Sequence, residues 1–240
     1  GNLAGINAMK EALPDVKNVA VFDTAFHQTM PKENYMYAIP REWYEKYGVR
    51  KYGFHGSSHK YITETMQKIL KKKDINLIIC HIGSGASISA IKDGDCINTS
   101  MGLTPNAGLI MGTRCGDIDA TILPYIMNKL NLSGKEMDTI MNKQSGLLGI
   151  SGVSSDSRDI ENGIKEGNKR CELAQKMYVR RIVDYIAKYY VELGGCDAIV
   201  FTAGCGEHTP ELREAVTENL KLFGVELDKD LNNNSPRGEE

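Results

Sequence analysis

The sequence predicts an α/β fold, in which strands alternate with helices. Three short apolar segments rich in β-branched residues, at 75–82, 86–91 and 197–202, have the length and composition of strands. Around them apolar residues recur at helical spacing, most extensively over 171–193. Three glycine-rich loops follow the strands, so that they could converge on one polyanionic ligand.

Composition limits the class of protein. With 240 residues, the chain can form one large or two small domains with a substantial core. Its net charge of −2 offers no general attraction to nucleic acid or anionic membranes, so an anion site must use local cations. No apolar run approaches the roughly 18 residues of a spanning helix, and no secretory signal opens the chain. The six scattered cysteines are typical of reduced thiols in a cytoplasmic protein.

The first 25 residues predict a helix and then a strand. Residues 3–13 have helical spacing, and Pro14 with Asp15 interrupts them before the apolar run 19–22. Asp23 would then lie at the carboxyl end of a strand, where open α/β sheets bind ligands. The alternative is that Asp23 only caps the following turn, and its position favours neither interpretation.

The stretch YGFHGSSH, residues 52–59, follows a short helix predicted over 41–47 and ended by Gly48. Ser57 or Ser58 is expected to cap the next helix. A glycine-flanked His55 on a loop, next to free N–H groups at a helix start, suits an anionic ligand better than a core.

A histidine metal site is the alternative for this stretch. His55 and His59 are spaced i, i+4, but no third ligand lies nearby in the sequence.

Residues 75–94 predict a β-hairpin. Gly83, Ser84 and Gly85 connect its two strands, and a second turn, Asp-Gly, follows. Glycines at the tip would let the backbone approach a ligand closely. The loop lacks the Lys-Ser/Thr ending of a P-loop and the third glycine of a dinucleotide site, so an ordinary hairpin remains an alternative.

Residues 98–119 are rich in Gly, Thr and Asn and have too little apolar periodicity for a long helix. Arg114 lies between Gly112 and Gly116, whose backbone freedom would let the chain press the guanidinium into a pocket. A surface arginine is the alternative interpretation.

The next part of the chain predicts three helices. Residues 122–129 have helical spacing, and Ser133 with Glu136 forms a capping box for a second helix. The longest helix covers 171–193 and is ended by the two glycines that follow it.

Two further loops carry candidate binding residues. Residues 145–160 are expected to be flexible, with Asp156 and Arg158 on a turn. Strand 197–202 runs into the glycine-rich loop 203–207, which could receive a phosphate or the sugar side of a nucleotide.

The C-terminal part predicts one more helix. Thr209 would cap it, Pro210 occupies its first turn and Gly224 stops it. Beyond Leu231 the chain is polar and aperiodic, so we expect it to fray.

Seven segments in series resemble the signatures of the acetate kinase family, in that family's order. The resemblance covers nearly the whole chain, and several long motifs together are far more specific than any one glycine loop. The segments are VFDTAFHQTMP, KYGFHGSSH, HIGSGASI, TSMGLTP, MGTRCGDID, SGVSSDSRD and VFTAGCGE.

The resemblance implies a ribonuclease H-like domain of the sugar kinase/actin superfamily, with a mixed sheet and flanking helices. It implies reversible phosphoryl transfer between ATP and acetate, giving ADP and acetyl phosphate, with Mg²⁺ or Mn²⁺ as cofactor. It also implies a homodimer, while the cysteines and the net charge favour a cytoplasmic protein without nucleic-acid or membrane partners. Residues 1–25 would be the tail of an incomplete N-terminal domain, and 26–240 the nucleotide-binding C-terminal domain, truncated at its end.

Functional residues of the family carry over onto matching positions. Asp23 matches the active-site aspartate, and His55 and Arg114 match the residues that stabilise the transition state. Phe54 and Pro105 match the lining of the acetate pocket. The matches to the nucleotide-binding residues are His81, Ile82, Gly83, Ser84, Gly85, Asp156, Ser157, Arg158, Gly204, Cys205, Gly206, Glu207 and His208.

Acetate is already ionised near neutral pH, so its attack on ATP needs no general base. We therefore expect Asp23 to bind Mg²⁺ or a metal-bound water, although the family's aspartate is often given a proton-transfer role.

The sequence also departs from the family. Ser84 and His208 replace residues that are commonly Asn, and Ser157 replaces a residue that is often larger. All three lie in the nucleotide segments, and Ser84 with His208 leaves pyrophosphate as an alternative phosphoryl donor. The chain is expected to begin after the family's first substrate-binding arginine and to end before its Mg²⁺-binding glutamate, and so to turn over poorly by itself.

Two other functions remain open. A non-catalytic nucleotide-binding module of actin-like fold fits the glycine loops equally well, but it gives no purpose to His55, Arg114 and Phe54. A propionate or butyrate kinase differs only in the acyl chain, where one methylene changes discrimination by about 1–3 kcal/mol.

Overall fold

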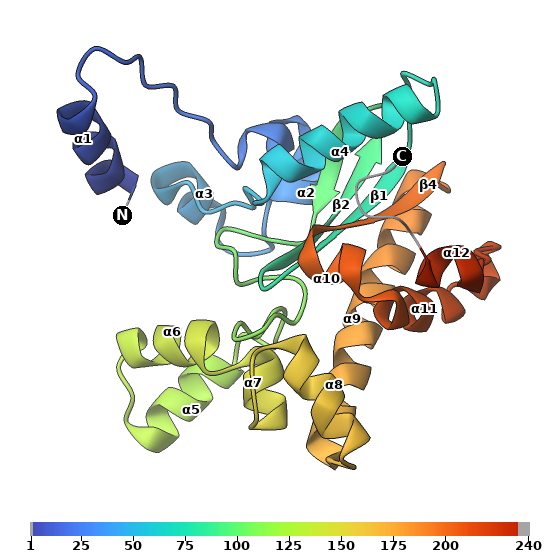
Figure 1. Ribbon diagram of the computed structural model, residues 1–240. Helices are drawn as coiled ribbons and strands as arrows, with labels where there is room; N and C mark the ends of the chain where they lie inside the picture. The colour runs from blue at the N-terminus through green and yellow to red at the C-terminus, as the bar shows by residue number, and fades with distance from the viewer. Residues whose placement is uncertain (1, 235–240) are drawn as a thin grey trace.

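The structure, a computed structural model, describes residues 2–234 and has one mixed sheet flanked by helices (Figure 1). The strands lie in the order β3-β2-β1-β4. β1 (Leu77–Ile82), β2 (Ala86–Lys92) and β3 (Asp95–Thr99) form an antiparallel meander, and β4 (Ala198–Thr202) pairs in parallel with β1. The predicted α/β class with a mixed sheet is confirmed.

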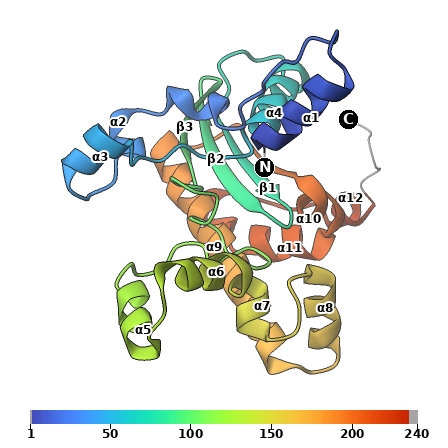
Figure 2. The same ribbon diagram turned by 90° about the vertical axis from the view of Figure 1, so that its left-hand side faces the viewer.

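Helices cover both faces of the sheet. None of the helices within residues 2–234 is long and apolar enough to cross a bilayer. Figure 2 shows α7 and α8 beside the N-terminal half of α9, with α6 and then α5 farther out. The helical segments are α1 (Asn2–Ala12), η1 (Ala25–Thr29), α2 (Lys32–Tyr35), α3 (Arg41–Tyr47), α4 (Gly56–Ile69), α5 (Ile122–Leu130), α6 (Gly134–Lys143), α7 (Gly146–Ser151), α8 (Ser157–Lys165), α9 (Lys169–Leu193), α10 (Ala203–His208), α11 (Pro210–Glu218), η2 (Lys221–Phe223) and α12 (Lys229–Asn233).

Alternate residues of β1 enter two different cores. Ile78, Cys80 and Ile82 belong to the larger core, which also contains the buried face of α9. Leu77 and Ile79 belong to a smaller core on the other face, where α4 packs. Because both faces of β1 are covered, its sequence is a continuous apolar run rather than an alternating one.

The strand register places two glycine-rich turns side by side. His81 of β1 pairs with Thr202 of β4. Because these two strands are parallel, their carboxyl ends lie side by side at the same end of the sheet. A Cβ on Gly83 would lie only 3.7 Å from the Cβ of Ala203. The loop after β1 and the start of α10 are therefore neighbours.

Several helices lie where the sequence predicts them. α1 and α5 cover nearly the predicted residues, and α3 ends at Gly48, which has a φ of 65°. α6 has the expected capping box between Ser133 and Glu136, and α9 ends at Gly194. These are the segments with the strongest local signals, namely periodicity and caps.

The strand predicted over residues 19–22 is wrong. These residues form no strand, and Val19, Val21 and Phe22 are exposed. An apolar run becomes a strand only where a neighbouring edge accepts its backbone hydrogen bonds. Figure 1 shows this segment linking the sheet-bearing body to α1, which stands away from it and has no buried residues. Asp23 consequently lies in a turn before η1 and not at a strand end.

Two loop predictions are also wrong, because they contain short helices. Residues 145–160 hold α7 and the start of α8, and Asp156 is the N-cap residue of α8. Residues 203–207 form most of α10. Helices of six residues carry too little periodicity to be detected in glycine- and serine-rich sequence.

Other boundaries differ as well. α4 begins at Gly56, with His55 at its N-cap position, instead of being capped by Ser57 or Ser58. β3 was not predicted, since it is a short edge strand with few apolar residues.

The C-terminal end of the fold also differs from expectation. α11 ends at Glu218, and the separate turn η2 precedes Gly224. Fraying beyond Leu231 is wrong for Asn232, which is buried in α12 and accepts a hydrogen bond from Arg213. Residues 235–240 lie outside the described residues.

Candidate functional site

The turn before α4 holds His55 in a left-handed backbone conformation, with a φ of 59°. This conformation costs a non-glycine residue roughly 1–2 kcal/mol, so its surroundings must hold it. Asp23 does so: Oδ2 accepts a hydrogen bond from the His55 amide at 2.7 Å, and its carbonyl oxygen accepts one from Gly56 at 2.8 Å. A Cβ on Gly56 would lie 2.3 Å from that carbonyl oxygen, so only glycine fits there.

The His55 ring is half-buried and held on two sides. Its Nδ1 lies 2.9 Å from Ser87 Oγ on β2. Its face stacks on the His81 ring, with 4.1 Å between centroids and 23° between planes. Burial, and then the proximity of His81, lower the pKa of His55 to about 4, so the imidazole is neutral near pH 7.

Arg114 faces the other end of this ring, across Gly85. A Cβ on Gly85 would lie 3.5 Å from His55 Nε2 and 2.7 Å from Arg114 Nη2. Arg114 Nη1 donates to the carbonyl oxygen of Pro105 at 2.6 Å. Burial lowers the pKa of Arg114, but an arginine remains charged at neutral pH. A neutral ring and a cation therefore border one glycine-lined space, which we call the His55–Arg114 centre.

Phe54 belongs to the same turn. Its half-buried side chain packs against the larger core, and its carbonyl oxygen lies 2.9 Å from Nε2 of the buried His27. The other His27 nitrogen lies 3.1 Å from Cys96 Sγ. His27 thereby ties the Phe54–His55 backbone to the sheet, a role that the sequence analysis missed.

A cavity of about 750 Å³ lies next to this centre, because it is lined by Ser84 and Thr113, the chain neighbours of Gly85 and Arg114. The loop after β1, the segment before Arg114, the start of α8 and α10 meet around it. The amide of Gly112 donates to the carbonyl oxygen of Ser84 at 3.4 Å, which joins the first two of these segments. The predicted nucleotide-binding residues in its lining are Gly83, Ser84, Asp156, Ser157, Arg158, Gly204, Cys205 and His208.

The other predicted nucleotide-binding residues lie outside this lining. His81 and Gly85 border the His55–Arg114 centre, whereas Ile82 and Gly206 are buried. Glu207 turns back on its own helix, where Oε1 accepts hydrogen bonds from Thr202 Oγ1 at 3.0 Å and the Ala203 amide at 2.9 Å.

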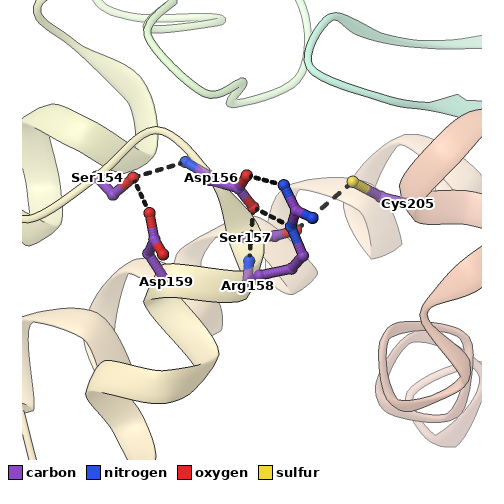
Figure 3. A network of polar contacts seen from close by, with 6 residues as sticks. All are labelled: Ser154, Asp156, Ser157, Arg158, Asp159 and Cys205. Atoms are coloured by element: carbon purple, nitrogen blue, oxygen red, sulfur yellow. Dashed lines mark hydrogen bonds and ion pairs between the residues drawn. The ribbon is translucent and has the colours of Figure 1, made fainter.

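Asp156 and Arg158 form an ion pair at the start of α8 (Figure 3). Arg158 donates from Nε to Oδ1 at 3.0 Å and from Nη2 to Oδ2 at 2.6 Å. These hydrogen bonds lower the pKa of Asp156 to about 2. Ser157 Oγ lies 3.6 Å from Cys205 Sγ, so the α8 and α10 walls of the cavity touch. The Arg158 side chain is 83% exposed, and such pairs contribute little stability, so a ligand can replace the partner.

Sequence reasoning missed several residues of the cavity wall. Gly112 and Thr113 directly precede Arg114 in the glycine-rich segment, and that position was the signal that could have found them. The others lie on helices or in the segments directly before them, and they carry no local signal. The missed residues are Gly112, Thr113, Leu147, Ser155, Glu161, Tyr178, Thr209 and Glu211.

The described part of the chain offers one candidate metal ligand beside the centre. Asp23 is exposed, and its Oδ2 accepts the hydrogen bond from the His55 amide, whereas its Oδ1 has no hydrogen-bond partner among residues 2–234. No group of three His, Cys, Asp or Glu residues in the described part of the chain could hold a metal ion alone. His55 Nδ1 and His59 Nε2 both face Ser87 Oγ and are already hydrogen bonded. Mg²⁺ usually takes one or two carboxylates together with substrate phosphates and water, and a single aspartate fits that pattern.

We expect acid to destabilise the protein through its clustered histidines. Burial lowers the pKa of His27, His55, His59 and His81. The unfolded chain, with histidine pKa values near about 6.5, then binds more protons than the folded one. The free energy of unfolding should fall as the pH drops from about 6.5 towards 4, by up to ~1.4 kcal/mol per pH unit for each histidine.

Urea unfolding at about pH 7, 6 and 5 measures this dependence. Replacing buried His27 with Gln should reduce the slope, whereas replacing exposed His208 with Gln is the matched control. A stability that stays constant over this range would contradict the prediction.

Comparison with known proteins identifies relatives. A family model described as the acetokinase family matches residues 1–240. The acetate kinase of Treponema denticola is 57% identical over 233 residues, which are 96% of this chain and 59% of that protein. The chain thus spans about 60% of the length of the relatives that it matches.

Solved structures agree with this assignment. The crystal structure of Porphyromonas gingivalis acetate kinase has a TM-score of 0.93 at 45% identity, over 99% of this chain and 60% of that one. The crystal structure of a propionate kinase from Francisella tularensis has a TM-score of 0.94 at 44% identity, over 97% and 60%. The expected fold of the sugar kinase/actin superfamily is confirmed.

Proposed function

The chain belongs to the acetokinase family, and we propose that it supplies the catalytic centre for reversible phosphoryl transfer between ATP and acetate. One observation carries the proposal: the His55–Arg114 centre and the 750 Å³ cavity share the loop 83–85 and the segment 112–114. A nucleotide in the cavity would therefore extend its terminal phosphate towards a cation and a neutral donor.

Phosphoryl transfer spreads negative charge over the equatorial oxygens of the migrating group, so catalysis is mostly positioning and electrostatic stabilisation. Arg114 supplies a charge whose orientation is set by the Pro105 carbonyl. His55 supplies a hydrogen-bond donor whose neutrality avoids repulsion with Arg114. Acetate enters ionised and acts as the nucleophile directly.

The acyl group would pack beside Phe54 and Pro105, next to the same two donors. Their side chains are half-buried, which leaves apolar surface for a methyl group. A propionate kinase is as similar in structure as an acetate kinase, so turnover of propionate is the second candidate activity. One added methylene shifts discrimination by about 1–3 kcal/mol, which favours a shared site with a graded preference.

The cavity residues suit the nucleotide. Backbone at Gly83, Ser84 and Gly204 can approach phosphates closely, and the Asp156–Arg158 pair offers polar contacts for the sugar or base. Ser84 and His208 in this wall depart from the family's pattern, so pyrophosphate is the alternative donor. ATP and pyrophosphate should be compared in the same assay.

Mg²⁺ is the proposed cofactor, with Asp23 as its protein ligand. When bound, the ion would neutralise phosphate charge. Asp23 itself has two separable tasks: one carboxylate oxygen holds the His55 amide, and the other is available to a metal or its water.

Two substitutions separate these tasks. Asp23→Asn keeps a hydrogen-bond acceptor for the His55 amide, whereas Asp23→Ala removes it. We expect Asn to retain the folding stability but to require a higher Mg²⁺ concentration for half-maximal rate. Ala should also lose about 1–2 kcal/mol of stability, because the left-handed turn loses a brace. If the wild type and the Asn variant need the same Mg²⁺ concentration for half-maximal rate, Asp23 is not a metal ligand.

An acyl phosphate assay with the product of the complete reading frame tests the function. Hydroxylamine traps acyl phosphate formed from ATP and acetate, propionate or butyrate. No product with any acid would reject the proposal. In that case, a titration with ATP that shows binding without acetate-dependent ADP release would indicate a non-catalytic nucleotide-binding module.

The proposal also covers the cell compartment, the oligomeric state and the domain organisation. All six cysteines are free, which suits the reducing cytoplasm. A homodimer is proposed from the family. Residues 1–25 are proposed as the tail of an N-terminal domain, with residues 26–240 as the nucleotide-binding domain.

A further inference from the structure

His59 is fully buried in the first turn of α4, and one of its ring nitrogens has no partner in the part of the chain that the structure describes. Its Nε2 lies 2.8 Å from Ser87 Oγ, whereas Nδ1 has no hydrogen-bond partner among residues 2–234. A neutral imidazole carries one proton. An unpaired buried N–H is rarer and costlier than an unpaired acceptor, so the proton belongs on Nε2. His59 therefore donates to Ser87.

Ser87 has only one hydroxyl hydrogen, and its oxygen already accepts from His59. The second short contact of this hydroxyl is His55 Nδ1 at 2.9 Å. Ser87 is fully buried in β2, so no solvent molecule competes as an acceptor for its hydroxyl hydrogen. It donates to His55 Nδ1, which must then be the unprotonated nitrogen of the ring.

The consequence lies at the other end of the His55 ring. With Nδ1 as an acceptor, the proton of the neutral ring is on Nε2, the atom beside Gly85 and the Arg114 guanidinium. We propose that Ser87 and His59 are positioning residues, which fix His55 as the Nε2–H tautomer and so aim a hydrogen-bond donor at the substrate space. The catalytic role given to this donor rests on the proposed function. The direction of the hydrogen bonds follows from the geometry alone.

Other groups near these rings leave this direction unchanged. His81 stacks on His55 and has its own partner, since its Nδ1 lies 2.8 Å from Ser58 Oγ. His27 contacts the edge of the His59 ring, but its nitrogens face Phe54 and Cys96. Asp23 bonds the His55 amide and not the ring. The serine-linked pair is thus one directed chain from His59 to His55.

Heteronuclear NMR of protein labelled in the imidazole nitrogens reads the tautomers directly. In the product of the complete reading frame near pH 7, we expect both His55 and His59 to be Nε2–H tautomers. Signals are assigned with His55→Gln and His59→Gln. An Nδ1–H tautomer or a doubly protonated ring at either residue would overturn the inference, and this readout needs no catalytic activity.

Ser87→Ala should move the His55 Nδ1 signal towards that of a free acceptor and lower kcat about 10- to 100-fold, with a smaller change in KM. Ser87→Thr retains the hydroxyl and should restore both. Ser58→Ala removes an equally short serine–histidine bond at the neighbouring ring and should leave the His55 signals unchanged. If the alanine variant does not fold, the wild-type tautomers decide the question.

A wild-type tautomer pattern as expected, together with an inactive enzyme, would refute the proposed phosphoryl transfer and leave the hydrogen-bond chain standing. Unchanged His55 signals in folded Ser87→Ala would refute the chain even if the enzyme is active.

Discussion

Arg114→Ala is expected to lower kcat for acetyl phosphate formation by about 10²- to 10³-fold, with a smaller effect on stability. The guanidinium is the only cationic group that borders the His55–Arg114 centre within the described residues. Its charge is preorganised by the Pro105 carbonyl, so the loss falls mainly on the transition state. Steady-state kinetics with acetate and ATP, alongside thermal unfolding, measures both effects.

Gly85→Ala offers a matched way to disturb the same group without removing it. The added Cβ would lie 2.7 Å from Arg114 Nη2, the far end of a flexible side chain that can move aside. We expect a fall in kcat with the fold retained. Arg114→Lys keeps the charge but loses the planar pair of donors, and should recover only part of the rate. Near-full turnover in the alanine variant of Arg114 would exclude it from the mechanism.

His55→Ala is expected to lower kcat by about 10²-fold or more, because a preorganised donor to the migrating phosphoryl group is lost. The ring is half-buried and its pKa is lowered to about 4, mainly by burial. Its donor form should consequently persist from neutral pH down to about pH 5, so the rate should show no step near 6.5, the usual histidine pKa.

The control for His55 is His208→Ala, on the cavity wall and exposed. It should change the KM for ATP more than kcat, because it lies in the proposed nucleotide site. His55→Asn keeps one hydrogen-bond donor on a shorter side chain, so we expect it to recover little of the kcat that His55→Ala loses. A His55→Ala enzyme with near wild-type turnover would contradict the proposed mechanism.

Local signals predicted much of the fold. The capping box at Ser133 and Glu136, the glycine stop at Gly48 and the long periodicity of α9 are complete within a few turns of chain, so distant residues could not change them. The run 19–22 failed for the opposite reason. Its apolar composition meets the needs of a strand, but a strand depends on a partner edge, which lies elsewhere in the chain.

Some features of the candidate site could likewise be predicted from local sequence, and others could not. Glycines around His55 and Arg114 marked both residues in the sequence, and resemblance named their roles. Nothing local indicated that a carboxylate at Asp23 holds the left-handed turn at His55, or that Ser87 on β2 joins His55, at the N-cap of α4, to His59 within that helix. These contacts link residues distant in sequence, and only the paired strands and packed helices bring them together.

The sequence by itself determined the α/β class, most of the long helices, the family and the identity of the chemically capable side chains. The tertiary structure decided which of them meet. Parallel pairing of β1 with β4 puts two glycine turns at one edge, and burial in the folded chain lowers the pKa of His55 and His59 and makes both rings neutral near pH 7. Charge and hydrogen-bond direction depend on solvent exclusion and on neighbours, which are properties of the folded chain and not of any segment.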